Sequence, residues 1–192
     1  MYQKQFVTKR LFIREYRKQD LDAFLEVVRQ PQVYVMTYGI PISYSRARGK
    51  WWFKILHSNR IHHTSYEYAV FLKDTGRYIG NVGLINIDAI HRHADISYYI
   101  DHAVTGQGYA TEAAGAMLQY GFGKLGFHKI NGVCMHQNGA SRRVMEKLGM
   151  HYEGTLRDDL YKDGEYYDLD RLSILEEEYY TFCKVENGIF NT

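Results

Sequence analysis

The sequence predicts a mixed α/β (α+β) fold, in which a sheet with antiparallel hairpins carries helices. Short segments of alternating apolar residues occur both before and after helical segments, so strands and helices are interleaved. In the longest amphipathic segment, residues 110–125, apolar side chains recur at the spacing of one helix face. Asp163-Gly164 separates two further strand-like segments, a pattern typical of a β-hairpin. An all-helical or all-β fold does not fit these three observations.

The other elements follow from the same periodicities. Alternating or continuous apolar residues predict strands at 11–14, 66–72, 78–88, 94–100 and 129–135. Helices are expected after Asp20, over roughly residues 43–59, and from about 139 to 148, where Gly149 ends the last one. The chain has no internal repeat, low-complexity segment or proline-rich linker, so residues 1–192 are expected to form one domain.

The net charge of +2 is too small to indicate a direct role with nucleic acid. The distribution of charge is uneven, because residues 27–66 contain no acidic side chain while residues 153–178 contain ten acidic and three basic ones. Each segment could be an ordinary solvated face. The functional alternative is that two surfaces of opposite charge flank one cleft.

Cysteine and histidine patterns give no indication of a metal site. Cys134 and Cys183 lie far apart, and Cys134 stands in an apolar stretch that predicts burial. The closest histidine groupings are 62–63 and the pair at 91 and 93, and neither has supporting ligands at metal-binding spacing. The first ten residues have no signal-peptide core, and no apolar run reaches membrane-spanning length, so a cytoplasmic location is expected.

The most informative segment lies between the strand at 94–100 and the long helix. It reads Val-Thr-Gly-Gln-Gly-Tyr-Ala-Thr-Glu-Ala over residues 104–113. Two glycines before a helix can expose successive N–H groups at its positive end, which is an arrangement that binds phosphate or pyrophosphate. Taken alone, the segment could equally be a tight turn, and it matches neither the lysine-containing phosphate loop nor the dinucleotide fingerprint.

A second segment, Asn-Gly-Ala-Ser-Arg-Arg-Val-Met-Glu-Lys-Leu-Gly-Met at 138–150, changes this assessment. Together the two segments resemble the hallmark loop and the Asn-x-x-Ser helix of the GNAT superfamily of acetyltransferases. Thr8-Lys9-Arg10-Leu11, the segment 153–157 and Tyr167-Asp168 resemble its RimJ/RimL branch, which acetylates the amino termini of ribosomal proteins. The resemblance implies a mixed, mostly antiparallel sheet of about seven strands, flanked by about four helices and splayed beside residues 96–100.

The resemblance also implies acetyl-CoA as co-substrate and a set of residues that bind it. The loop amides would hold the pyrophosphate, the strand at 96–100 would bind the pantetheine arm like an added strand, and a bulge there would aim one amide at the thioester carbonyl. Arg142, Arg143 and Lys147 are near enough in sequence to reach the 3′-phosphate, although ordinary helix solvation explains them equally well. The expected cofactor-binding residues are Tyr99, Ile100, Thr105, Gly106, Gln107, Gly108, Tyr109, Ala110, Thr111, Asn138, Ser141 and Arg143.

The chain departs from the GNAT pattern at two positions. Thr105 replaces the expected Gln/Arg of the loop, and Met145 stands where many relatives carry an acidic tyrosine. Ser141, one helical turn from Asn138, is the predicted donor to the leaving thiolate, although it could simply bond to backbone. Glu165 is the weakly preferred general base, and the alternatives are Asp158, Asp159, Asp163, Glu112, Asp95 and His102.

Three functions therefore compete. The leading one is direct acetyl transfer to the α-amino group of a protein or peptide, because an α-amine has a pKa of about 7.7 to 8.0 and is easily deprotonated. The second is acetylation of a small amine such as a polyamine, an amino sugar or an antibiotic. The third is a CoA-binding regulatory module without turnover, against which the intact loop and Ser141 argue. The sequence leaves open whether the protein is a monomer or a homodimer.

Overall fold

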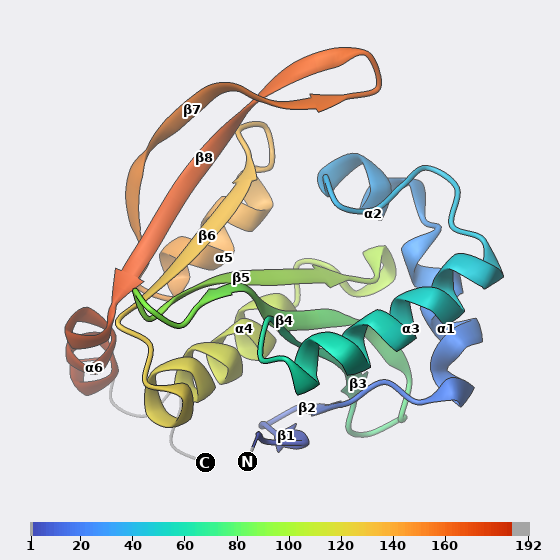
Figure 1. Ribbon diagram of the computed structural model, residues 1–192, viewed down its shortest axis with the longest axis horizontal. Helices are drawn as coiled ribbons and strands as arrows, with labels where there is room; N and C mark the ends of the chain where they lie inside the picture. The colour runs from blue at the N-terminus through green and yellow to red at the C-terminus, as the bar shows by residue number, and fades with distance from the viewer. Residues whose placement is uncertain (1, 186–192) are drawn as a thin grey trace.

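The computed structural model describes residues 2–185 and arranges their strands in one eight-stranded sheet (Figure 1). The strand order is β1-β2-β3-β4-β5-β6-β8-β7. Every neighbouring pair is antiparallel except β5 and β6. The strands are β1 (Gln5–Val7), β2 (Leu11–Arg14), β3 (Tyr66–Leu72), β4 (Tyr78–Asp88), β5 (His93–Ile100), β6 (Lys129–Met135), β7 (His151–Lys162) and β8 (Glu165–Leu175).

Helices cover both faces of this sheet. They are α1 (Leu21–Val28), α2 (Pro31–Met36), α3 (Arg46–Ile61), α4 (Tyr109–Tyr120), α5 (Gly139–Lys147) and α6 (Glu176–Val185). Apolar side chains of α4, α5 and α6 pack on one face, and those of α1 and α2 pack on the other. The strands divide their side chains accordingly, so that Tyr68 of β3 belongs to the first core and Phe71 to the second.

The functionally important feature of the sheet is a split between β5 and β6. Their parallel pairing covers only three residues, from His93 opposite Lys129 to Asp95 opposite Asn131, after which the strands diverge. Figure 1 shows β6, β8 and β7 turning away from β5 at this point. The sheet therefore opens beside residues 96–100, as the resemblance to the GNAT superfamily implied.

The predicted strands and helices are present, and the structure adds β1, α2 and α6. The long helix ends at Tyr120, and the chain continues as a π-turn, Gly121–Leu125. A side chain at Gly121 would meet Ile130 Cδ1 at 2.6 Å, so glycine lets this turn pack closely against β6. The predicted bulge in residues 96–100 is wrong. Their pairing with β4 is regular, and the register shift lies between Ile85 and Asp88, where Asn86 has φ +50°.

Candidate active site

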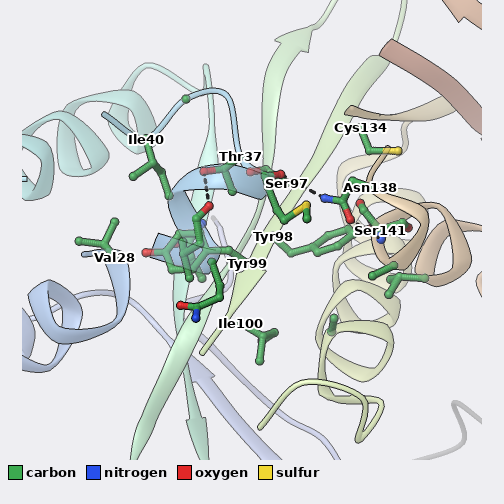
Figure 2. A pocket seen from close by; sticks show the side chains of 18 of the residues that line it. Val28, Thr37, Ile40, Ser97, Tyr98, Tyr99, Ile100, Cys134, Asn138 and Ser141 are labelled. Atoms are coloured by element: carbon green, nitrogen blue, oxygen red, sulfur yellow. Dashed lines mark hydrogen bonds between the residues drawn. The ribbon is translucent and has the colours of Figure 1, made fainter. Parts of the chain in front are cut away.

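A cavity of about 940 Å³ fills the split in the sheet. Its walls come from β5, from the loop before α4, from α5, and from the segment 31–41 that follows α1. Strand β5 runs between two halves of this cleft. Figure 2 shows Tyr98 pointing toward Ser141 on one side and Tyr99 toward Val28 and Ile40 on the other.

The glycine loop forms one end of the first half. Gly106 and Gly108 have φ +78° and +83°, the left-handed region that glycine tolerates, and Gly108 is the N-cap of α4. The amides of Tyr109, Ala110 and Thr111 belong to the first helical turn and so have no acceptor within the helix. No atom of residues 2–185 lies within 4 Å of where a side chain at Gly106 would begin. The loop is an open cradle of N–H groups suited to a phosphate.

An ion pair from the start of β2 braces this loop. Arg10 Nε lies 2.6 Å from Glu112 Oε2, and its guanidinium also donates to the carbonyl of Gln107 at 2.8 Å. Thr8 donates to Glu112 Oε1 at 2.6 Å. Burial acts to raise the pKa of Glu112, but these hydrogen bonds prevail and leave the pKa lowered. Glu112 is therefore a structural carboxylate here. Gln107, which was expected to bind the cofactor, does not line the cleft, and its carbonyl accepts from Arg10 instead.

Strand β5 presents free backbone groups to the cleft. Asp101 donates its amide to Ile79 of β4 at 2.7 Å, and backbone direction alternates along an antiparallel strand. The amides and carbonyls of Ile96, Tyr98 and Ile100 consequently point to the edge that β6 has left. Ile100 thus has the geometry expected of an arm-binding residue. The backbone of Tyr99 faces β4 instead, and its side chain enters the second half of the cleft.

Helix α5 supplies the polar side chains opposite β5. Asn138 Oδ1 accepts from the amide of Ser141 at 3.1 Å as an N-cap, while its Nδ2 donates to the carbonyl of Met36. Both polar atoms of Asn138 are therefore engaged within the protein. Ser141 Oγ lies 2.9 Å from the hydroxyl of Tyr98, which is also within hydrogen-bond distance of the Ser141 carbonyl. Tyr98, which the sequence analysis did not single out, forms a hydroxyl pair with Ser141 at the cleft.

The three basic residues of α5 separate into two groups. Arg142 turns away from the cleft, pairs with Glu146 and Asp170, and lies over the ring of Tyr152. Arg143 and Lys147 are exposed and line the cleft one helical turn apart. Of the three, only Arg143 and Lys147 are placed to meet a phosphate of a bound cofactor.

Cys134 lines the cleft but is only 4% exposed. Burial, with the nearby carboxylate of Asp170, raises the pKa of its thiol to about 11. A thiol in this state is almost entirely protonated at neutral pH and is a poor nucleophile. Cys134 is a buried residue, as the sequence predicted.

The second half of the cleft is covered by the segment 31–41. The tip of the β7–β8 hairpin holds this segment, because Lys162 Nζ donates to the carbonyls of Tyr34 at 2.6 Å and Thr37 at 2.8 Å. The hydroxyl of Tyr34 in turn donates to Asp163 of the same hairpin. Asn138 also holds the C-terminal end of α2, through the carbonyl of Met36. The hairpin therefore acts on the cleft by positioning a wall.

The carboxylates proposed as general base lie mostly elsewhere. Glu165 is exposed on the hairpin, where it accepts from the hydroxyl of Tyr167, and it does not line the cleft. Asp158, Asp159 and Asp163 are also exposed and do not line the cleft. The hairpin tip contacts α2 from outside, so its carboxylates cannot reach across that helix. His102 and Asp95 do line the cleft.

The structure adds one carboxylate that the sequence analysis missed. Glu67 of β3 lines the second half of the cleft and accepts from Asn81 Nδ2 at 3.1 Å. Burial raises its pKa to about 7, although Asn81 and Arg60 act to lower it. The only indication in the sequence is a lone acidic residue within an otherwise apolar strand, which does not reveal what lies across the sheet.

Among residues 2–185, no group of three or more His, Cys, Asp or Glu side chains is arranged to hold a metal ion. Nor does any helix in this range combine the length and apolarity that crossing a membrane requires.

A split sheet, a phosphate cradle at a helix N-terminus and a free strand edge beside it define a protein that binds a phosphorylated cofactor with an extended arm. Residues 10–151 match the acetyltransferase (GNAT) domain family, and the chain belongs to that family. It is an acetyl-CoA-dependent N-acetyltransferase.

Similar proteins are named as acetyltransferases, and one of them has a named acceptor, spermidine. The uncharacterized N-acetyltransferase YnaD of Bacillus subtilis strain 168 is 31% identical over 90% of this chain and 97% of its own. The spermidine N(1)-acetyltransferase of Escherichia coli K12 is 30% identical over 65% of this chain and 66% of its own. A GNAT acetyltransferase structure from Bacillus anthracis has a TM-score of 0.80 and 25% identity, covering 90% of this chain and 99% of that one.

Proposed function

We propose that this protein transfers the acetyl group of acetyl-CoA directly to the α-amino group of a protein or peptide. The observation that supports it best is the single cleft with two halves on either side of β5. One half has the open strand edge and glycine cradle that suit the cofactor, and the other half opens toward an acceptor. The two substrates would meet at β5 without a covalent enzyme intermediate.

Direct attack is favoured because the described residues of the cleft offer no activated nucleophile that could carry the acetyl group as a covalent intermediate. Its cysteine, Cys134, has a pKa raised by burial, which disfavours the thiolate. The pair formed by Ser141 and Tyr98 has no histidine beside it to accept a proton, and the hydroxyl of Tyr98 also has its pKa raised by burial. We assign Ser141 as the donor that hydrogen-bonds the departing thiolate, with the single proton of Tyr98 directed to Ser141 Oγ rather than to the Ser141 carbonyl, so that the serine proton is free for sulfur.

The residues present fit acetyl-CoA. The first-turn amides of α4 and the loop glycines would bind the pyrophosphate, with Arg143 and Lys147 near the 3′-phosphate. The open edge of β5 would pair with the amide groups of the pantetheine arm. Acetyl-CoA supplies a thioester carbonyl, and an amide of that edge would donate to its oxygen as negative charge develops.

A polypeptide acceptor is favoured by the surroundings of the second half. Large apolar side chains are exposed at its rim, among them Val35, Met36, Tyr38 and Trp51, with exposures of 45–56%. An exposed apolar rim of this kind is typical of a surface that binds a larger partner. These rim residues belong to the segment 27–66, which contains no acidic residue, so an acidic or neutral polypeptide would dock there.

A small polyamine is the second candidate, and it is favoured by the similarity to spermidine N(1)-acetyltransferase. The cleft offers such a substrate little charge, because Glu67 and Asp95 are its only acidic lining residues within the described part of the chain. Several cationic centres in one molecule would leave some of them without a carboxylate partner.

The test is release of CoA thiol from acetyl-CoA in the presence of three acceptors. These are a lysine-free peptide with a free amino terminus, an N-blocked peptide that contains lysine, and spermidine. The first should be acetylated with the highest kcat/KM. A higher value for spermidine would reject the peptide acceptor, and activity on only the blocked peptide would show that side-chain amines are the substrate.

A further inference from the structure

We propose that Glu67 is the group that binds the acceptor's amine and takes its proton, and that the aromatic chamber around it selects amines carrying one charge and an apolar group. The inference deepens the function proposed above and rests on it. It assigns the acceptor subsite, which is built by β3, β4, β5, α1 and the start of α3.

Gly83 is what brings Glu67 to the cleft. Glu67, Gly83 and Ser97 stand in one row across β3, β4 and β5. A side chain at Gly83 would begin 2.6 Å from Glu67 Cγ, so the glutamate lies in the space that this glycine leaves empty. Its carboxyl thereby crosses β4 toward β5, the strand along which the acetyl group would be presented.

A directed chain of hydrogen bonds fixes this carboxyl. Tyr16 donates to Asn81 Oδ1 at 2.9 Å, and Asn81 donates to Glu67 Oε2 at 3.1 Å. Because the proton of Tyr16 is used in this way, Tyr78 must donate to Tyr16 and Tyr99 to Tyr78, over 3.0 Å and 3.1 Å. The hydroxyl oxygen of Tyr99 is then left with lone pairs that can accept from an N–H group at the cleft.

Glu67 is also the cleft carboxylate with a vacant oxygen. Both oxygens of Asp95 are occupied, by Asn86 Nδ2 at 2.8 Å and Asn131 Nδ2 at 3.1 Å. Within residues 2–185, no donor lies within hydrogen-bond distance of Glu67 Oε1. Arg60 of α3 donates to the main-chain carbonyl of Glu67 and pairs with Glu15; its charge acts to lower the pKa of Glu67, but it makes no hydrogen bond to the carboxyl. An ammonium group can therefore reach Oε1 without displacing a partner.

The walls around this carboxyl are aromatic and apolar. Phe24 and Trp52 stack with centroids 4.9 Å apart, and Tyr44 meets the edge of Phe24 at 5.3 Å. These three side chains line the cleft together with Tyr99, Val28 and Ile40. Arg48 lies over the Tyr44 ring at 5.9 Å and adds a positive charge near the entrance. A chamber with one free carboxylate and this lining favours a monovalent ammonium attached to an aromatic or branched apolar group.

In the proposed reaction, the acceptor nitrogen loses two protons, forms one C–N bond and displaces one C–S bond. The ammonium gives one proton to Glu67, which passes it to water, and the neutral nitrogen forms the C–N bond to the acetyl carbon. The C–S bond then breaks and its electron pair leaves on sulfur. The second proton of the nitrogen ends on that sulfur, with Ser141 donating and water returning the proton. A carboxyl whose pKa is about 7 suits the first step, because it accepts a proton near neutral pH and releases it readily.

The test compares wild type with Glu67→Gln, which keeps the hydrogen bond with Asn81 and removes the charge. Acceptors are 2-phenylethylamine, a phenylalanine-initiated peptide amide, a glycine-initiated one and spermidine. Wild type should acetylate the first two with a kcat/KM at least about tenfold higher than the other two, and the ratio of kcat/KM between the first two separates a small amine from a peptide as the acceptor. Glu67→Gln should lose about 10²–10³-fold in kcat and lose the rise in rate near pH 7, with the affinity for acetyl-CoA unchanged. Glu26→Gln, on the exposed face of α1, is the matched control.

The outcomes separate this inference from the proposed function. Full activity of Glu67→Gln across pH 6–9 would overturn the inference and leave the proposed function intact, whereas a preference for spermidine would overturn both the inference and the peptide acceptor. If wild type bound acetyl-CoA but acetylated none of these amines, the proposed acceptor class would fail. In that case thermal unfolding of the CoA complex still decides about Glu67, because 2-phenylethylamine should stabilise wild type and not Glu67→Gln.

Discussion

The two halves of the cleft differ in the groups that form them: backbone groups form one half and side chains form the other. The cofactor half is made of backbone: left-handed glycines, first-turn amides and a strand edge without a partner. The acceptor half is made of side chains: a stacked aromatic pair, a hydroxyl chain and one carboxylate. In the proposed function, these backbone groups bind the pyrophosphate and the pantetheine arm of acetyl-CoA, which stay the same whatever the acceptor is. The side-chain half can vary without disturbing these backbone groups.

The strongest test of this division is a side chain in the backbone half. Gly106→Val would place a β-branched residue at φ +78° in the space through which a diphosphate must approach. We expect the Kd for acetyl-CoA to rise at least about 100-fold, measured by calorimetry, which corresponds to roughly 2.7 kcal/mol. Gly76→Val is the matched control, because Gly76 has φ +67° and equally open surroundings in the β3–β4 turn. Equal weakening by both variants would mean that backbone strain alone, not cofactor access, is responsible.

The next largest effect concerns stability, and it belongs to the acceptor half. The pKa of Glu67 rises from 4.5 to about 7 on folding, so between these values the native state holds a proton that the unfolded state has lost. Wild type therefore loses stability as the pH rises from about 4.5 to 7, and Glu67→Gln does not. We expect Glu67→Gln to be more stable at pH 8 by about 1–3 kcal/mol in urea unfolding, with a smaller gap at pH 5. A variant less stable than wild type at pH 8 would contradict this.

The junction between the halves gives a smaller effect. Ser141→Ala removes the hydroxyl beside Tyr98 and should lower kcat about tenfold, or 1.4 kcal/mol, while leaving the Kd for acetyl-CoA within about twofold. Steady-state CoA release with saturating acetyl-CoA measures it. Unchanged turnover would remove Ser141 from the reaction and leave it as a residue that bonds only within the cleft wall.

The smallest effect tests whether the hairpin serves only the acceptor half. Lys162→Met removes the ammonium that holds the carbonyls of Tyr34 and Thr37 and so loosens the segment 31–41. We expect the KM for the acceptor to rise about fivefold, roughly 1 kcal/mol, because part of a charge-assisted contact is lost. The KM for acetyl-CoA should stay constant. A parallel rise in both would show that the two halves are coupled through α2.

The sequence anticipated the cofactor half more completely than the acceptor half. Gly106, Gly108 and the helix behind them are contiguous, so their geometry follows from local backbone preferences. Ser141 and Asn138 lie one turn apart on one helix and could be placed by the same reasoning. Glu165 is the weakly preferred base because it begins a strand of the hairpin that, by resemblance to the GNAT superfamily, borders the acceptor cleft, but a position at the start of a strand does not fix which wall of a cleft the side chain reaches.

What the sequence by itself determined is the order of strands and helices and the glycine pair before the long helix, because these depend on local periodicity and on turns whose residues are neighbours in the chain. The family and the opening beside residues 96–100 were implied by the resemblance of its two motifs to the GNAT superfamily. Only the tertiary structure decided that Glu67 crosses the empty space over Gly83, that Tyr16, Tyr78 and Tyr99 direct their hydroxyl protons toward Asn81, and that Lys162 holds the cleft wall. Each of these contacts joins residues from different elements, and strand register rather than sequence distance sets which of them meet.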